Sequence, residues 1–295
     1  MLDMRCRLTS DSTYTFLKPC IKILPVKQNN VPRGIKGTLY MARAVSKEKG
    51  RPYFYIYIIL WVISPITNGF SSVGASLVDA YTVLYARVLN KPLIHVVGDS
   101  HVVPFRGSMP FLAHHLGAAT AYNLPKKKSS TRSNEQLFKV INKLGKRDIV
   151  MLSFGEIDCR IHIYYQHNKK SNEKYSISDL IDRTIANYGE VMAQLRQLGV
   201  NFCVYCVSPA TNVGNEYKYP FYGAPEVRSQ INRMFNEKLK AFCQKNGYKF
   251  IDIYDKVADK EGLMLKEYSG DDIHLNKKAV GLVWAELREK IGVII

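Results

Sequence analysis

Pro92-Leu93-Ile94-His95-Val96-Val97-Gly98-Asp99-Ser100-His101 is an apolar run of strand length that ends in a short polar block. Two more polar blocks are placed in a similar way. Gly155-Glu156-Ile157-Asp158 follows a second apolar run, and Asp271-Asp272-Ile273-His274 follows a third run after an intervening loop. If these strands lie parallel in one sheet, the three blocks gather at its carboxyl edge, where open α/β sheets bind ligands. The sequence therefore predicts that a serine, a histidine and carboxylates converge at that edge.

From Pro92 onward, runs of strand length alternate with segments of helical periodicity. Such alternation indicates a parallel sheet covered by helices on both faces, which is the α/β class. Ser133 with Gln136, and Ser176 with Asp179, are predicted capping boxes at two helix starts. The five predicted strands are 93–97, 118–124, 148–154, 200–207 and 248–254. The predicted helices are 110–116, 133–145, 176–199, 227–247 and 277–291.

The charge of the chain divides it into two regions. We interpret residues 1–91 as a basic N-terminal region of unknown fold and residues 92–295 as one α/β domain. The net charge is +17, and the N-terminal region is more than twice as basic per residue as the rest. A basic surface can serve nucleic acid, anionic membranes or acidic glycans. No zinc-finger spacing, RNP-like motif or helix-turn-helix pattern accompanies it, so we expect no nucleic-acid partner.

Residues 53–70 form an apolar segment that bears on localisation. Its strongly apolar part, 53–64, is shorter than the roughly 20 residues that a spanning helix needs. Three interpretations stay open: a membrane anchor, a signal peptide if translation begins at Met41, and a segment buried against protein. A cytoplasmic location is favoured, with membrane-anchored or secreted forms as alternatives.

The cysteines favour a reducing compartment. Cys203 and Cys206 have CxxC spacing, but they lie in a run of strand character, where the two sulfurs point to opposite faces. We therefore expect buried free thiols rather than a disulfide or a metal site. The chain also has no Asn-x-Ser/Thr glycosylation sequon.

Ser100 and His274 are the candidate reacting groups. Ser100 follows a strand and a Gly-Asp turn, so its hydroxyl is presented at the sheet edge and the next helix offers backbone N–H groups to an anion. Asp271 precedes His274 by three residues, so its carboxylate can hold one ring nitrogen while the other faces the serine. Together they predict a serine nucleophile for hydrolysis or transfer of an acyl group. Surface or capping roles are expected for His101, His114, His115 and His162.

The three blocks resemble those of the SGNH (GDSL-type) hydrolase superfamily, and the resemblance covers about residues 92–295. Gly98-Asp99-Ser100 is similar to the first block of that family. Gly155-x-x-Asp158 is similar to its third block, and Asp271-x-x-His274 is similar to its fifth.

This resemblance implies a flavodoxin-like three-layer α/β/α sandwich with a five-stranded parallel sheet. It implies Ser100 as nucleophile, His274 as base and Asp271 as the group that orients the base. It also implies cleavage or transfer of acyl esters on lipids, glycans or small molecules, with neither a metal nor an organic cofactor. The oxyanion and substrate site is then expected to include Gly98, Asp99, Gly155 and Asp158.

The chain departs from the family's pattern at two positions. The third block usually carries an Asn as an oxyanion donor, where this chain has Ile157, and the second-block glycine usually follows the second strand, whereas Gly117 precedes the predicted one. Loss of one such donor costs about 3 kcal/mol, or roughly 10²–10³ in rate. Arg160 and Arg106 are candidate replacements, because a guanidinium offers several fixed donors. Arg160 could instead pair with Asp158.

The expected function is a serine esterase that removes a small, acetyl-like group from a carbohydrate or a small-molecule ester. One alternative is a glycan O-acetyltransferase that uses the same three residues. Another is a non-catalytic glycan-binding or scaffold protein that keeps the fold. A membrane segment at 53–70 would favour the transferase, and an intact serine–histidine contact would argue against the scaffold. No oligomeric state follows from the sequence.

Overall fold

The computed structural model describes residues 71–169, 175–212 and 220–292, and side chains from residue 78 onward. Two compact units divide the chain between Tyr85 and Ala86, and the second unit contains the α/β domain. The apolar segment 53–70 lies outside the described residues. Within the described part of the chain, no helix combines the length and the hydropathy that crossing a membrane requires.

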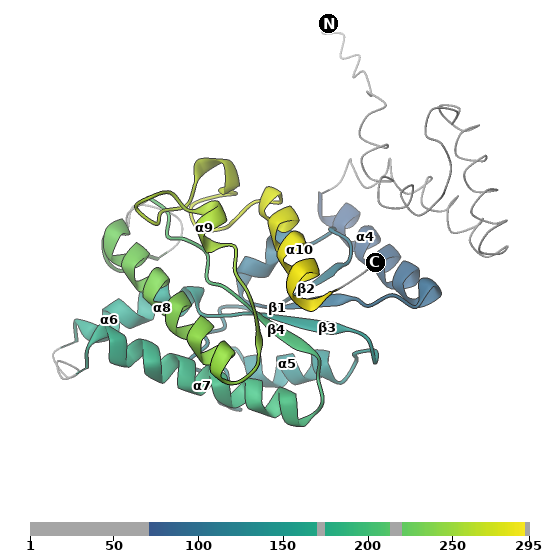
Figure 1. The fold of residues 1–295 in the computed structure, drawn as a ribbon, viewed down its shortest axis with the longest axis horizontal. Helices are drawn as coiled ribbons and strands as arrows, with labels where there is room; N and C mark the ends of the chain where they lie inside the picture. Colours follow the sequence, from purple (N-terminus) through teal and green to yellow (C-terminus); the bar gives the residue numbers. More distant parts are fainter. Residues whose placement is uncertain (1–70, 170–174, 213–219, 293–295) are drawn as a thin grey trace, which may run out of the picture. The chain divides into compact units, whose positions relative to one another are not determined.

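A five-stranded parallel sheet forms the centre of the domain (Figure 1). Its strands lie in the order β2-β1-β3-β4-β5, which is the flavodoxin-like order. β1 and β3 are buried along their whole length, as expected for central strands that helices cover on both faces. The predicted five-stranded parallel α/β sheet is therefore confirmed. The bounds are β1 Ile94–Gly98, β2 Phe111–His115, β3 Ile149–Ser153, β4 Phe202–Tyr205 and β5 Lys249–Ile251.

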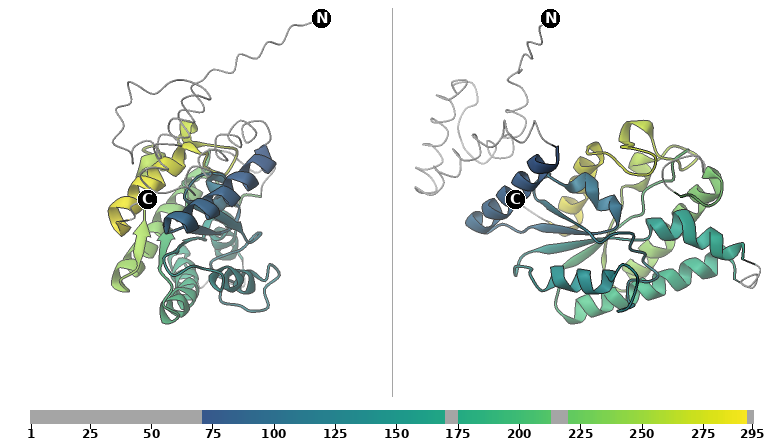
Figure 2. Two further views of the ribbon diagram at one scale, coloured as in Figure 1. Left: turned by 90° about the vertical axis from the view of Figure 1, so that its right-hand side faces the viewer. Right: turned by 180° about the vertical axis from the view of Figure 1, so that it is seen from behind.

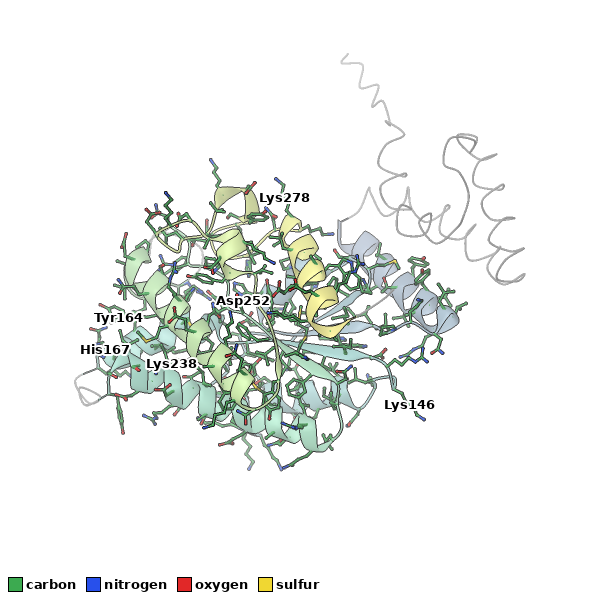
Figure 3. The ribbon with its side chains drawn as sticks, viewed as in Figure 1. Lys146, Tyr164, His167, Lys238, Asp252 and Lys278 are labelled. Atoms are coloured by element: carbon green, nitrogen blue, oxygen red, sulfur yellow. The ribbon has the colours of Figure 1, made fainter. Side chains whose placement is uncertain are left out.

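Helices cover both faces of this sheet and make three layers (Figures 1 and 2). Helices α5, α7 and α8 lie on one face, and α10 lies on the other. The bounds are α5 Ser133–Ile141, α7 Ile177–Gln197, α8 Pro225–Lys245 and α10 Lys278–Ile291. The shorter helices are α6 Ile163–His167 and α9 Tyr254–Val257, and α4 spans Ser71–Leu89 before β1. Lys238 of α8, labelled in Figure 3, donates to Ser178 and Asp182 near the start of α7.

The second strand differs from the prediction. Residues 110–116, predicted as a helix, contain β2, and residues 118–124, predicted as a strand, form turns. Three successive residues, 119–121, are buried in this segment, so its burial does not alternate as in a strand. The backbone N–H groups of Ala121 and Tyr122 donate to the Asp158 carboxylate instead of to a neighbouring strand. As a consequence Gly117 follows the second strand, rather than preceding it as predicted.

Of the two predicted capping boxes, one is confirmed. Ser176 and Asp179 exchange side-chain to backbone hydrogen bonds at the start of α7. At the start of α5, the residue before the helix is Arg132, with φ of 49° and no side-chain cap. Gln136 donates instead to the carbonyl of Thr131, so that predicted box was wrong.

The prediction of buried free thiols is confirmed for the four described cysteines. Burial raises the pKa of each of these thiols, so all four are protonated and inert at neutral pH. They are Cys159, Cys203, Cys206 and Cys243. Cys6 and Cys20 lie outside the described residues.

Candidate active site

Ser100 lies directly beyond the carboxyl end of β1, at the start of the short 3-10 helix η2 (Ser100–Phe105). Asp99 caps this helix by accepting a hydrogen bond from the backbone N–H of His101 at 2.9 Å. Gly98 ends the strand in a place where a side chain does not fit. A Cβ atom there would lie 1.9 Å from the carbonyl oxygen of Ser153 on β3. Glycine at 98 therefore lets β1 and β3 approach closely at the point where the serine is presented.

His274 reaches Ser100 from the loop between β5 and α10. Its Nε2 lies 2.7 Å from the Ser100 Oγ. Its Nδ1 lies 2.7 Å from Oδ2 of Asp271, whose Oδ1 also accepts the backbone N–H groups of Ile273 and His274 at 2.9 and 2.8 Å. A carboxylate only accepts, so we assign the proton to Nδ1, which leaves Nε2 to accept the serine hydroxyl proton.

The surroundings of His274 favour its neutral form. Burial lowers the pKa of His274, and the nearby charge of His101 lowers it further, against the opposite effect of Asp271. Burial of Asp271 opposes its charge, but the hydrogen bonds that it accepts from Ile273 and His274 outweigh this and lower the pKa of Asp271. At neutral pH the pair is therefore an ionised carboxylate and an unprotonated base.

Gly117 stands at the end of β2, beside this serine turn. The N–H of Leu116 donates to the carbonyl of Gly98 at 2.8 Å, which continues the β1–β2 register one residue past the strands. Gly117 is exposed, with φ of 75°, and its backbone N–H donates to no group among the described residues. The geometry thus leaves a free backbone donor near the start of η2.

The third block is buried and holds two neighbouring segments in place. Gly155 has φ of 115°, and a Cβ atom there would meet the ring of Phe235 at 2.7 Å. Asp158 accepts the N–H groups of Ala121 and Tyr122 at 2.7 and 3.2 Å. Burial raises the pKa of Asp158 to about 7, although these two hydrogen bonds act in the opposite direction.

Arg160 pairs with Glu156 and not with Asp158, which corrects that alternative. Its Nε lies 2.7 Å from the Glu156 Oε1, four residues earlier in the chain. Its guanidinium also donates to the carbonyl of Pro220 and lies over the Phe221 ring. The Asp158 oxygens are already taken by backbone N–H groups, whereas the Glu156 carboxylate faces the arginine.

Neither candidate arginine is brought to Ser100 by a contact among the described residues. Arg160 is buried and engaged as described above. Arg106 is exposed at the end of η2. Ile157 is buried and has no side-chain donor to offer.

His101 is a site residue that the sequence analysis placed wrongly on the surface or at a cap. Its side chain is buried, and its ring centroid lies 4.8 Å from that of His274. Its Nδ1 lies 3.1 Å from the Asp99 Oδ1 and 3.7 Å from the Glu156 Oε2. The one signal in the sequence is its position directly after Ser100, on a turn that continues with the apolar Val102.

The side chains of Asp99, His101 and Glu156 lie close enough together to be tested as a metal site. One ligand atom from each of Asp99, His101 and Glu156 lies within 4.8 Å of the others. In this arrangement Glu156 is paired with Arg160 and lies near the buried Arg228, and Asp99 faces the His101 ring. The charge balance fits a protonated imidazole better than an added cation.

A cleft of about 580 Å³ opens between the segment after β2 and the helices α6 and α7. Its walls carry two aromatic rings, Tyr122 and Tyr175, and the polar groups of Asn123, His162 and Arg183. The Asp158 carboxyl, which holds the segment after β2, also lines it. A pocket of this size that combines aromatic faces with a few polar groups suits a small organic ligand.

The fold and this site define the class of protein. Residues 72–280 match the family model described as the GDSL-like Lipase/Acylhydrolase family, so the chain belongs to that family. The sequence has no significant match among curated proteins.

Solved structures of that class resemble this chain. A GDSL-like lipase from Bacteroides thetaiotaomicron has 13% identity and a TM-score of 0.46, over 74% of this chain and 96% of that one. A catalytic mutant of Axe2, an acetylxylan esterase from Geobacillus stearothermophilus, has 12% identity and a TM-score of 0.43, over 69% of this chain and 95% of that one.

Proposed function

We propose that this acylhydrolase-family chain is a serine esterase that removes a small acyl group from a carbohydrate. The observation that carries the proposal is the continuous hydrogen-bonded line from Asp271 through His274 to Ser100. Oγ of Ser100 and Nε2 of His274 are 2.7 Å apart, within the distance over which a base takes the proton of a nucleophile.

The chemistry follows from these contacts. Oγ of Ser100 attacks the ester carbonyl carbon while His274 Nε2 accepts the hydroxyl proton, and Asp271 stabilises the imidazolium. The tetrahedral intermediate collapses by breaking the bond to the sugar oxygen, which takes that proton from His274. Water then attacks the acyl-enzyme with His274 as base, and the acid and free Ser100 are released.

Backbone donors are proposed to hold the oxyanion. The N–H groups of Ser100 and Gly117 both lie where β1 and β2 end, and the Gly117 N–H donates to no group among the described residues. Ile157 in the third block supplies no side-chain donor to the oxyanion. We therefore expect slower turnover than a three-donor site, by roughly 10²–10³.

We propose that the sugar part of the ester binds in the cleft, although Ser100, His274 and Asp271 are not among the residues that line it. The rings of Tyr122 and Tyr175 have flat apolar faces and a polar edge, which suits the mixed surface of a sugar. Lys126 lies over the Tyr122 ring and Arg183 over the Tyr175 ring, so a sugar would pack on the opposite face of each ring. Asn123 and Arg183 add hydrogen-bonding groups on the same walls. A cleft of about 580 Å³ also has room for an acceptor sugar, which would favour the O-acetyltransferase alternative.

The test is ester hydrolysis by the full chain, wild type beside Ser100→Ala and His274→Ala, with exposed Ser130→Ala as the matched control. We expect each of the two site substitutions to lower kcat by about 10³-fold or more, and Ser130→Ala to leave it unchanged. Substrates are a chromogenic acetate, a longer-chain ester and an acetylated xylo-oligosaccharide, with and without an acceptor sugar.

The outcomes separate the alternatives. Acetyl transfer to the acceptor in preference to water would identify a transferase. Folded wild-type protein that binds the oligosaccharide without turning over any ester would support the glycan-binding scaffold. Hydrolysis that survives both site substitutions would contradict the assigned roles of Ser100 and His274.

A further inference from the structure

Both ring nitrogens of His101 face hydrogen-bond acceptors. Nε2 lies 3.1 Å from the backbone carbonyl oxygen of Ile273, which can only accept, so Nε2 carries a proton. Nδ1 lies 3.1 Å from Oδ1 of Asp99, a carboxylate oxygen that also accepts only. An imidazole that satisfies both contacts carries two protons and a positive charge.

Buried negative charge surrounds this ring. The Glu156 Oε2 lies 3.7 Å from the His101 Nδ1, and Glu156 is otherwise held by Arg160. The Asp99 Oδ2 and the Glu156 Oε2 are fully buried and hydrogen-bond to no described residue. Two buried carboxylates need cationic partners, because their charges are costly to remove from water. Arg160, together with the buried Arg228 of α8, supplies positive charge for Glu156, and His101 faces Asp99.

His101 also links the two halves of the active site. It follows Ser100 in the chain, and its Nε2 contacts Ile273, the residue before His274. Among the described residues, this contact joins the serine turn to the histidine loop independently of the Ser100–His274 hydrogen bond. The two rings are 4.8 Å apart between centroids, with a tilt of 45°.

We propose that His101 is a buried imidazolium that positions the catalytic loop and keeps His274 in its neutral, proton-accepting form. Asp99 and Glu156 hold the charge, and the bond to the Ile273 carbonyl holds His274 against Ser100. The role rests on the proposed esterase function. His101 is a positioning residue, because it acts through His274 and not on the substrate.

The charges around the two rings come from four elements. The turn after β1 contributes Asp99, the turn after β3 contributes Glu156 with Arg160, and the loop before α10 contributes Asp271. A fourth element, α8, contributes the buried Arg228, whose charge acts on Glu156. Burial opposes the charge of His101, but Glu156 and Asp99 outweigh it and raise its pKa to about 9. His101 is therefore charged over the pH range in which His274 must be neutral.

The first experiment measures charge states without relying on activity. In the full chain labelled with ¹⁵N-histidine, we expect both His101 ring nitrogens to be protonated at pH 7, and His274 to titrate below the ordinary histidine range. In His101→Gln, the pKa of His274 should rise by about one unit or more, because a like charge has been removed. Exposed His115→Gln is the matched control and should leave His274 unchanged.

The second experiment measures catalysis. For His101→Gln we expect kcat to fall by about 10–100-fold with KM nearly unchanged, and the acid limb of kcat/KM to move to higher pH. A loss of folding alone would lower the active fraction without moving this limb.

Several results would overturn the proposal. They are a neutral His101 in the wild type, an unshifted His274 in His101→Gln, and a change of the His101 Nδ1 signal on adding Zn²⁺ or a chelator, which would indicate a metal site instead. If ester hydrolysis does not depend on Ser100 but both His101 ring nitrogens are protonated, the proposed esterase function is wrong and the assigned charge of His101 still holds.

Discussion

His274 must be neutral to accept the proton of Ser100, so the protonation of this one residue sets the pH dependence of the reaction. Burial lowers the pKa of His274, and the neighbouring charge of His101 adds to the effect. A base with a lowered pKa stays active to lower pH than an ordinary histidine with a pKa of about 6.5. The Asp271 carboxylate limits this shift without reversing it.

We therefore predict that kcat/KM rises with pH along an acid limb whose midpoint lies below about 6.5. At neutral pH, kcat/KM should no longer change with pH. The measurement is hydrolysis of a chromogenic acetate from pH 4.5 to 8.5, with circular dichroism at each pH to show that the protein stays folded. A midpoint clearly above the ordinary histidine value would mean that His274 is not held neutral as described.

At the scale of elements, the connection after β2 depends on one buried carboxyl group. Asp158 accepts two successive backbone N–H groups, from Ala121 and Tyr122, and so holds the segment that carries Gly117 at one end and cleft residues at the other. An amide in its place has a single oxygen, and its NH₂ group would face one of these two donors.

We expect Asp158→Asn to lower the free energy of unfolding by about 1–3 kcal/mol, because one buried N–H loses its partner. Amide hydrogen exchange at Ala121 and Tyr122 should accelerate, and esterase activity should fall with it. The matched control is Asp182→Asn, which removes an exposed ion pair with Lys238 and should cost about 1 kcal/mol or less. Equal exchange rates in Asp158→Asn and wild type would contradict the role given to this carboxyl.

The element assignments show where sequence patterns carry structural information and where they do not. The long periodic helix α7 and its Ser176–Asp179 box were predicted, because both signals are local. The strand β2 was missed, since a short apolar run looks alike in a helix and in a strand. Residues 118–124 have the sequence pattern of a strand but form turns. Their Ala121 and Tyr122 N–H groups donate to Asp158, which lies 37 and 36 positions away in the chain, so this contact could not be predicted from the local pattern.

At the scale of the whole molecule, parallel topology brings together residues that are far apart in the chain. The alternation of strand-length runs with helical segments predicted the sheet, and the three polar blocks that follow strands nominated Ser100, Asp271 and His274. The His274 ring lies 2.7 Å from both the Ser100 Oγ and the Asp271 Oδ2, because the end of β1 and the loop before α10 meet at the same edge of the sheet. The burial of His101 could not be predicted in this way, because it needs Glu156 and Ile273 from two other segments.

Ser100 is proposed to be a nucleophile that His274 activates. The most direct measurement is labelling of the folded full chain with a fluorophosphonate, which forms a Ser100 Oγ–P bond as fluoride leaves, followed by mass spectrometry of the peptides. We predict one adduct, on Ser100, that is absent from Ser100→Ala, strongly reduced in His274→Ala and unchanged in Ser130→Ala. No adduct on the folded wild type, or an adduct on another residue, would contradict the account.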